Sequence, residues 1–194
     1  MKNRLLLFTI LLTLVSAPAF SMESKKYSPK EIAENTIMKE DLLTYPDGDA
    51  VHEIRLLDRT TSNTWGYITF FVPKEEAIVK LNTLKVVGKE HYRKGIGRYL
   101  FNAMLEKLYA LNKQHAGQQG RLLFTKIEFI AAPQDINIGL DNESIQRYRT
   151  EKAARLPGLI LFYESVGCKV DSCGTDTAYM HFDLVKFYLK KYFL

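Results

Sequence analysis

A short turn that combines glycine with basic residues is the strongest candidate for chemistry in this sequence. It follows a β-rich run ending at Val87, opens a segment of helical periodicity, and reads Arg93-Lys94-Gly95-Ile96-Gly97-Arg98. A helix N-terminus presents unpaired backbone N–H groups and the positive end of the helix dipole, and glycines let an anion approach the backbone. The turn therefore predicts a pyrophosphate site, and the alternative is an ordinary helix start with a solvated basic turn. It is not a P-loop, because neither Gly-Lys-Ser nor Gly-Lys-Thr occurs.

Together with two later segments, this turn resembles a known family. Strand, turn and helix through Tyr99-Leu100 resemble motif A of the GNAT superfamily of N-acetyltransferases, whose turn binds the pyrophosphate of acetyl-coenzyme A. Leu161-Phe162-Tyr163-Glu164-Ser165-Val166-Gly167-Cys168-Lys169-Val170 resembles the family's helix-to-strand signature, and Ala178 to Leu184 resembles its last strand. The resemblance covers roughly Val51 to Leu184. It implies an α/β fold with a mixed, mostly antiparallel central sheet flanked by helices.

The resemblance also implies an activity, the transfer of an acetyl group from acetyl-coenzyme A, as co-substrate, to a primary amine. The backbone of Val86 and Val87 would pair with the pantetheine arm, and an N–H near Val87 would polarise the thioester carbonyl. Tyr163 would donate a proton to the departing thiolate, a role that suits a phenol; the alternative is an amphipathic core tyrosine. The pyrophosphate would lie on the turn formed by Tyr92, Arg93, Lys94, Gly95, Ile96, Gly97 and Arg98.

Three features depart from the family pattern. Tyr92 occupies the position of the usual Gln or Arg, so backbone N–H groups would contribute much of the binding of the pyrophosphate. Arg155 stands where the family often has an asparagine. The stretch from Ala131 to Glu151 has no clear periodicity, and it is an insertion at the edge where acceptors usually enter.

A general base for the acceptor amine is less clearly marked. Glu128, on the strand beside the expected cleft, is the candidate, and the alternative is a solvated or salt-bridged glutamate. His181 and His91 are further candidates, each with a structural or exposed role as the alternative. No metal site is expected, because no histidine stands at ligand spacing beside Cys168 and Cys173. These two cysteines form either a disulfide or two unpaired thiols.

The elements that must position these residues follow from the hydrophobic period. Three β-rich runs, Val51–Leu57, Trp65–Val72 and Ala77–Val87, predict an antiparallel meander. From Gly95 onward, apolar residues recur every three or four positions and predict a helix that ends before Gly117. The remaining predictions are a capped helix starting at Ser28-Pro29-Lys30-Glu31, a turn at Pro46–Asp49, a strand over Leu122–Ile130, a short helix over Pro157–Val166 capped by Gly167, a hairpin around Asp171–Gly174 and a packed tail from Val185.

Residues 1–21 have the pattern of a secretory signal peptide. Met1–Arg4 is basic, Leu5–Val15 is apolar, and small residues follow it, so cleavage is expected after Ala19 or Ser21. Residues 22–194 would then form a single exported domain, periplasmic or secreted. The alternative is an uncleaved N-terminal membrane anchor, although the apolar run is shorter than the roughly 20 residues that a spanning helix needs.

Composition bounds the partners. The length of 194 residues fits one domain. The formal net charge of +5 is compatible with an anionic ligand and does not by itself point to nucleic acid. The expected acceptor is an amine on a small molecule or a protein, and the resemblance implies a homodimer. An exported transferase lacks its cytoplasmic acyl donor, so one hypothesis is an effector that acts inside a host cell. The alternative hypothesis is an exported GNAT-fold binding module without catalysis.

Overall fold

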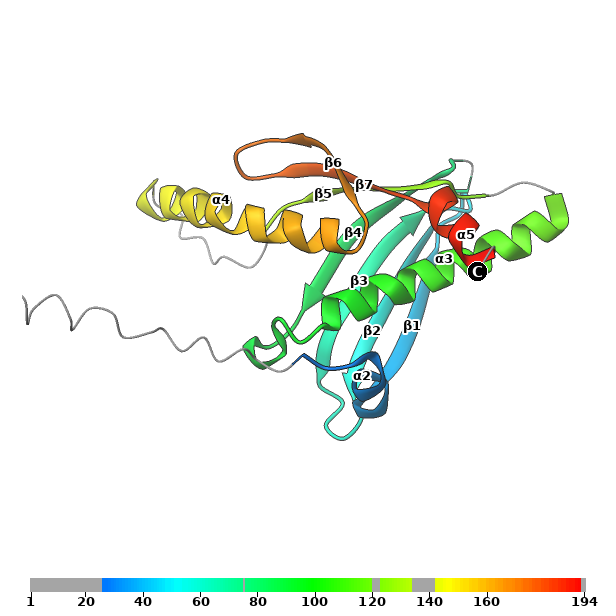
Figure 1. Ribbon diagram of the computed structural model, residues 1–194, viewed down its shortest axis with the longest axis horizontal. Helices are drawn as coiled ribbons and strands as arrows, with labels where there is room; N and C mark the ends of the chain where they lie inside the picture. Colours follow the sequence, from blue (N-terminus) through cyan, green and yellow to red (C-terminus); the bar gives the residue numbers. More distant parts are fainter. Residues whose placement is uncertain (1–25, 75, 120–122, 134–141, 193–194) are drawn as a thin grey trace, which may run out of the picture.

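Seven strands form one mixed sheet in the computed structural model, which describes residues 26–74, 76–119, 123–133 and 142–192. Their order across the sheet is β1-β2-β3-β4-β5-β7-β6 (Figure 1). All neighbouring strands are antiparallel except β4 and β5, which are parallel. The predicted α/β fold with a mostly antiparallel sheet is therefore confirmed. The strands are β1 (Thr36–Thr44), β2 (Ala50–Asp58), β3 (Thr64–Val72), β4 (Ile78–Val86), β5 (Lys126–Ala131), β6 (Lys169–Cys173) and β7 (Ala178–Asp183).

The chain enters the sheet through a short capped helix, α2 (Pro29–Asn35). The Ser28 hydroxyl accepts a hydrogen bond from the Glu31 N–H at 3.1 Å, and the Glu31 carboxylate accepts one from the Ser28 N–H at 2.7 Å. This capping box was predicted. The strand β1 that follows was not predicted, because Lys39, Glu40 and Asp41 interrupt its apolar pattern.

The three predicted strands β2, β3 and β4 form the expected antiparallel meander, extended by β1. Strand β4 then pairs with β5 over three residues, with Ile78, Val79 and Lys80 opposite Lys126, Ile127 and Glu128. Beyond this point β4 continues to Val86 and β5 to Ala131 without pairing with each other. The sheet therefore opens between its two central strands.

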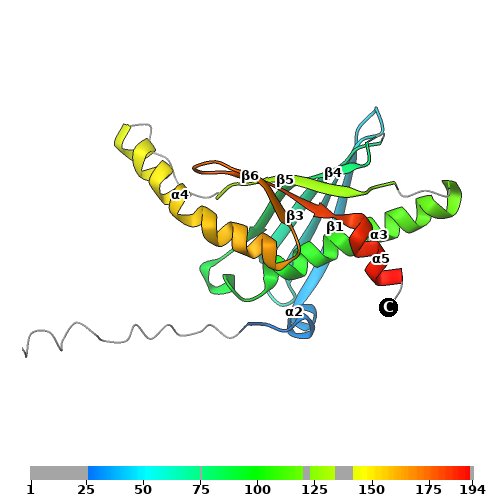
Figure 2. The same cartoon turned by 45° about the horizontal axis from the view of Figure 1, so that its top comes forward.

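Helices α3 (Ile96–Gln119), α4 (Asn142–Ser165) and α5 (Leu184–Tyr192) pack on the same face of the sheet, as Figure 1 and Figure 2 show. Phe101 of α3 meets Phe182 of β7 with ring centroids 5.7 Å apart, and Tyr163 of α4 meets Phe129 of β5 at 4.5 Å. Tyr109 of α3 and Tyr188 of α5 also touch, at 5.7 Å. The core lies between these helices and the sheet.

The opposite face of the sheet carries no fully buried side chain among the described strands. The register places outward-facing residues in rows across the strands, for example Arg55 beside Tyr67 and Glu128 beside His181. Each of them is half-buried or exposed. The helices thus cover one face only.

Two helices are longer than predicted. Helix α3 continues through Gly117 to Gln119, because a single glycine costs about 1 kcal/mol in a helix without ending it. Helix α4 begins at Asn142, well before Pro157, and contains that proline in its interior. Most described residues of its first half are exposed, so this half lacks the apolar period by which a helix is predicted.

The C-terminal elements match their predictions, except that Asp171–Cys173, predicted as the hairpin turn, belongs to strand β6. Gly167 ends α4 with φ of 98°, and β6 and β7 form the final hairpin. Strand β5 begins at Lys126 rather than Leu122, since the buried Asn112 side chain binds the preceding segment through the N–H groups of Leu123 and Phe124, at 2.8 and 2.7 Å. The tail is the packed helix α5, with Tyr188 buried.

The predicted signal peptide lies outside the described residues. Within the described part of the chain, none of the helices has both the length and the apolar character needed to cross a bilayer.

His52 is expected to make stability depend on pH. Its ring lies on the helix-facing side of β2 and stacks on Phe70, with centroids 5.1 Å apart. Burial, and then the charge of Lys107, lower the pKa of His52 below its usual 6.5. When the pH falls below 6.5, the unfolded chain therefore gains a proton that the folded chain resists, and the free energy of unfolding decreases until the pH passes the folded pKa.

The substitution His52→Gln should remove this part of the acid sensitivity. Urea unfolding of both proteins at about pH 7.5 and about pH 5.5 measures it. The wild-type protein should lose more stability between the two pH values than His52→Gln, and equal losses would contradict the assignment.

Candidate functional site

The basic turn connects β4 to α3 through backbone conformations that favour glycine. Gly88 and Gly95 have φ of 82° and 93°, and Arg93 has φ of 60°. The Tyr99 N–H donates to the Gly95 carbonyl at 3.0 Å, so the helical hydrogen bonds begin there. The N–H groups of Ile96, Gly97 and Arg98 precede this bond and have no acceptor within the helix. They remain available to a ligand.

A cavity of about 710 Å³ opens directly in front of this helix start. Three basic side chains line it, those of Lys26, Arg93 and Arg98, and no carboxylate does so among the described residues. Its charge and the helix N-terminus both favour an anion. The lining residues are Lys26, Tyr27, Pro29, Ile32, Leu84, Val86, His91, Arg93, Gly95, Ile96, Gly97, Arg98, Tyr99, Asn102, Leu159, Phe162, Tyr163 and Ser165.

A second cavity of about 200 Å³ occupies the opening between β4 and β5. It is lined by the unpaired part of β4 from Leu81 to Val86, by Phe129 and Ile130 of β5, and by residues that follow β5. Four residues line both cavities: Leu84, Val86, Leu159 and Tyr163. The two cavities therefore meet beside Tyr163.

Tyr163 is 6% exposed and lies where the cavities meet. Its ring is fixed by Phe129, Phe162 and Phe101, at centroid distances of 4.5, 5.0 and 6.4 Å. Within the described part of the chain its hydroxyl has no hydrogen-bond partner. Burial, and then the nearby Cys168 thiol, raise the pKa of Tyr163 well above its usual 10. The hydroxyl is therefore a neutral donor without an acceptor among the described residues.

The segment before α2 lies on the basic turn, which the sequence did not indicate. The Tyr27 N–H donates to the Lys94 carbonyl at 2.9 Å. The Tyr27 ring stacks on Trp65 at 5.7 Å, and Trp65 stacks on His91 at 4.5 Å. Lys26 and Tyr27 thereby become part of the large cavity. No local pattern could reveal this contact, because it joins residues far apart in the chain.

The predicted cofactor residues fall into distinct places. Gly95, Ile96 and Gly97 line the large cavity, together with Arg93 and Arg98. The Arg98 guanidinium also donates to the Ser165 hydroxyl at 3.0 Å, so it joins α3 to α4.

Tyr92 and Lys94 lie elsewhere. Tyr92 lines the small cavity instead of the large one. The Lys94 ammonium lies over the Tyr27 ring, 5.5 Å from its centroid, and Lys94 lines neither cavity.

The backbone donor of β4 that faces the opening is that of Val86 and not that of Val87. The Val87 N–H donates to the Trp65 carbonyl at 2.8 Å, so it points toward β3. Because N–H directions alternate along a strand, the Val86 N–H points toward the unpaired edge. Val86 also lines both cavities, whereas Val87 lines neither.

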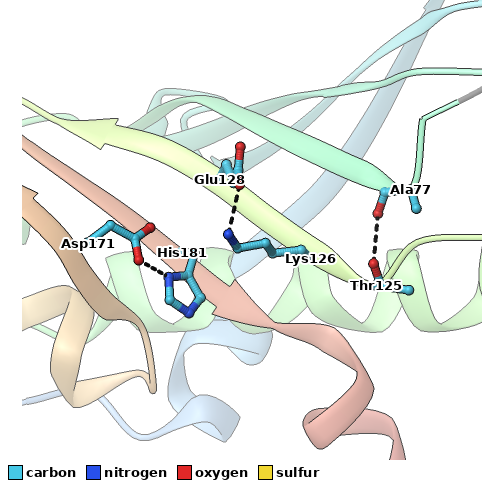
Figure 3. Close-up of polar contacts among 6 residues, drawn as sticks. All are labelled: Ala77, Thr125, Lys126, Glu128, Asp171 and His181. Atoms are coloured by element: carbon cyan, nitrogen blue, oxygen red, sulfur yellow. Dashed lines mark hydrogen bonds and ion pairs between the residues drawn. The ribbon is translucent and has the colours of Figure 1, made fainter.

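Two of the three candidate bases, Glu128 and His181, lie away from the cavities. Glu128 faces the uncovered side of the sheet, where its carboxylate accepts a hydrogen bond from Lys126 at 2.8 Å, and His181 pairs with Asp171 at 2.7 Å (Figure 3). Neither Glu128 nor His181 lines a cavity. His91 lines the large cavity at its basic end, where its Nδ1 is buried and has no partner among the described residues.

The two cysteines are unpaired. Cys168 is buried, and burial raises the pKa of its thiol to about 12, while Cys173 is exposed. Within the described ranges no cluster of three or more His, Cys, Asp or Glu residues has the geometry to hold a metal ion.

Two further lining residues were not predicted from the sequence: Leu159, which lines both cavities, and Phe162, which lines the large one. Leu159 lies four residues before Tyr163, hence on the same helix face. That spacing could have identified it once Tyr163 was chosen. Phe162 lies close to Gly97, where an added Cβ would approach the Phe162 ring to 3.3 Å.

Comparison with known proteins places acetyltransferases among the similar structures. Neither a protein-family model nor a curated protein matches the sequence. An aminoglycoside 6'-N-acetyltransferase complexed with coenzyme A is 18% identical, with a TM-score of 0.44, over 72% of this chain and 74% of that chain. The ribosomal-protein-S18-alanine N-acetyltransferase from Escherichia coli is 15% identical, with a TM-score of 0.40, over 81% and 77%. An acetyltransferase of the GNAT family from Bacillus anthracis is 12% identical, with a TM-score of 0.38, over 69% and 66%.

Proposed function

We propose that this chain is a GNAT-type N-acyltransferase that moves an acetyl group from acetyl-coenzyme A to a primary amine. The observation that carries the proposal is the continuous path from a basic cavity at a helix N-terminus to the buried hydroxyl of Tyr163, which has no hydrogen-bond partner among the described residues. A ligand with a polyanionic end and a reactive end fits such a path. The small cavity beyond Tyr163 gives the acceptor its own entrance.

Coenzyme A would lie in the large cavity with its pyrophosphate on the N–H groups of Ile96, Gly97 and Arg98. Arg93 and Lys26 would add positive charge around the phosphates. The pantetheine arm would follow the unpaired edge of β4 near Leu84 and Val86, as an added strand pairs with a sheet edge. The thioester would then lie beside Tyr163.

The chemistry is a direct displacement. The neutral amine nitrogen attacks the thioester carbon, the C–N bond forms, and the C–S bond breaks. The Val86 N–H donates to the carbonyl oxygen while negative charge develops there. The amine loses one proton and the coenzyme A thiolate gains one, so protons balance.

Tyr163 contributes a hydrogen bond to the departing sulfur. A thiol has a pKa of about 8.5, below that of a buried phenol, so the hydroxyl stabilises the thiolate without giving up its proton completely. Water delivers the final proton and removes that of the amine. Glu128 does not take the amine proton, because it lines neither cavity and its carboxylate accepts a hydrogen bond from Lys126.

Coenzyme A binding tests the cavity assignment. Isothermal titration of the purified protein with coenzyme A and acetyl-coenzyme A should show micromolar affinity. The substitution Gly97→Val should weaken binding by at least about tenfold, or about 1.4 kcal/mol, because the new side chain projects toward Phe162 in the cavity.

Gly158→Val is the matched control, since Gly158 is also helical and an added Cβ there meets nothing within 4 Å. Its affinity should stay within about twofold of wild type. No binding by folded wild-type protein at millimolar ligand would remove the basis of the proposed function.

The substitution Tyr163→Phe should separate catalysis from binding. Release of coenzyme A thiol from acetyl-coenzyme A is followed with spermidine, kanamycin or a lysine-containing peptide as acceptor. Turnover should fall by about a hundredfold or more, with coenzyme A affinity unchanged, because only the hydrogen bond to the departing sulfur is lost. Tyr179→Phe, on the uncovered face and 53% exposed, is the control that should retain activity.

Unchanged turnover in Tyr163→Phe would contradict the role of this hydroxyl. If wild-type protein binds coenzyme A and transfers to none of these acceptors, the alternative of a binding module without catalysis gains support.

We also propose that residues 1–21 direct export, consistent with their basic, apolar and small-residue order. Protein recovered from a bacterial periplasm or medium should have an intact mass that begins at Phe20 or Met22. A membrane-bound chain that retains Met1 would instead identify an anchor. Because acyl-coenzyme A is a cytoplasmic metabolite, an exported enzyme would reach its donor inside a recipient cell.

A further inference from the structure

Strand β1 forms one edge of the sheet (Figure 1). Its two faces both expose apolar side chains. Its nine residues pair with β2 along their whole length, and no described strand covers its other edge. Exposed fractions are 48% for Ile37, 40% for Met38, 61% for Leu42 and 57% for Leu43. A long apolar edge of this kind is a template for pairing with another strand.

Two hydrogen bonds at the ends of β1 define which backbone groups face outward. The Arg59 N–H donates to the Asn35 carbonyl at 2.9 Å, and the Tyr45 N–H donates to the Asp49 carbonyl at 2.8 Å. Both pairs continue the β1–β2 register, so odd-numbered residues of β1 bond to β2. The even-numbered residues therefore point their N–H and C=O groups to the open edge.

We propose that β1 pairs antiparallel with β1 of a second copy of this chain, about a two-fold axis at Glu40. This register places even-numbered residues opposite even-numbered residues, so the outward N–H and C=O groups of both strands meet. The side chains match as well, except that Glu40 meets Glu40 at the axis. Opposite residues are Ile37 and Leu43, Met38 and Leu42, Lys39 and Asp41, and Thr36 and Thr44.

Neighbouring registers lose this match. An axis at Lys39 would place lysine opposite lysine and Met38 opposite Glu40. An axis at Asp41 would place aspartate opposite aspartate and Lys39 opposite Leu43. An axis between two residues would place even opposite odd residues and leave the outward backbone groups without acceptors. The self-complementary order of β1 thus selects one isologous arrangement.

The charge at the axis is compensated within each chain. The Lys107 ammonium of α3 donates to the Glu40 carboxylate at 2.6 Å, so two lysines accompany the two glutamates. On the other face, Arg55 donates to Asp41 at 2.7 Å, and the Lys39 ammonium lies 3.6 Å from the same carboxylate. Together with Lys39, Asp41 and Arg55 of the second copy, these three charges would form a network of six.

A charge exchange tests the proposed dimer. Sedimentation equilibrium of the purified protein should show a dimer at micromolar concentration. Lys39→Asp and Asp41→Lys should each weaken the dimer by roughly tenfold, because each creates two pairs of like charges across the axis. Lys169→Asp, an exposed lysine on β6 at the opposite edge, is the control and should leave the dimer unchanged.

Mixing the two single variants should restore dimerisation, since each strand then meets opposite charges in the other. This rescue excludes misfolding as the cause of the loss. Amide hydrogen exchange gives an independent readout, because the N–H groups of Met38, Glu40 and Leu42 should be protected only in the dimer. A wild-type monomer, a dimer indifferent to both substitutions, or a mixture that stays monomeric would overturn the proposal, whatever the outcome for coenzyme A.

Discussion

The separation of β4 from β5 is the constraint on which the candidate site depends. The two parallel strands pair over three residues and then leave an unpaired edge from Leu81 to Val86. If β4 and β5 paired along their whole length, β5 would form hydrogen bonds with this edge. Here the edge forms one wall of both cavities, and α4 supplies the other wall through Leu159 and Tyr163.

Aromatic packing fixes the position of the Tyr163 ring at this opening. Phe129 comes from β5, Phe101 from α3 and Phe162 from α4, so the ring of Tyr163 is held by three elements at once. The hydroxyl group is then the one part of the side chain that packing does not satisfy. A rigid ring with a free polar end is what a hydrogen bond to a developing charge requires.

The signals that the sequence carries locally were the reliable ones. The Ser28–Glu31 capping box and the Gly167 helix end depend on residues within a few positions of each other, and the meander on the alternation within each strand. All three were confirmed. Strand β1 was missed because its central charges hide an edge strand. Two backbone hydrogen bonds could not be predicted: the Tyr27 N–H donates to the Lys94 carbonyl, and the Val87 N–H donates to the Trp65 carbonyl. Both join segments that are distant in the sequence, so no local pattern encodes them.

The contact between Tyr27 and the basic turn has a practical consequence for handling the protein. Because Lys26 and Tyr27 line the large cavity, a fusion that begins next to Lys26 would lie beside that cavity. Helix α5 instead packs near the middle of α3, through Tyr109 and Tyr188. An affinity tag, a fluorophore or a surface linker therefore belongs at the C-terminal end, because no residue of α5 lines the large cavity.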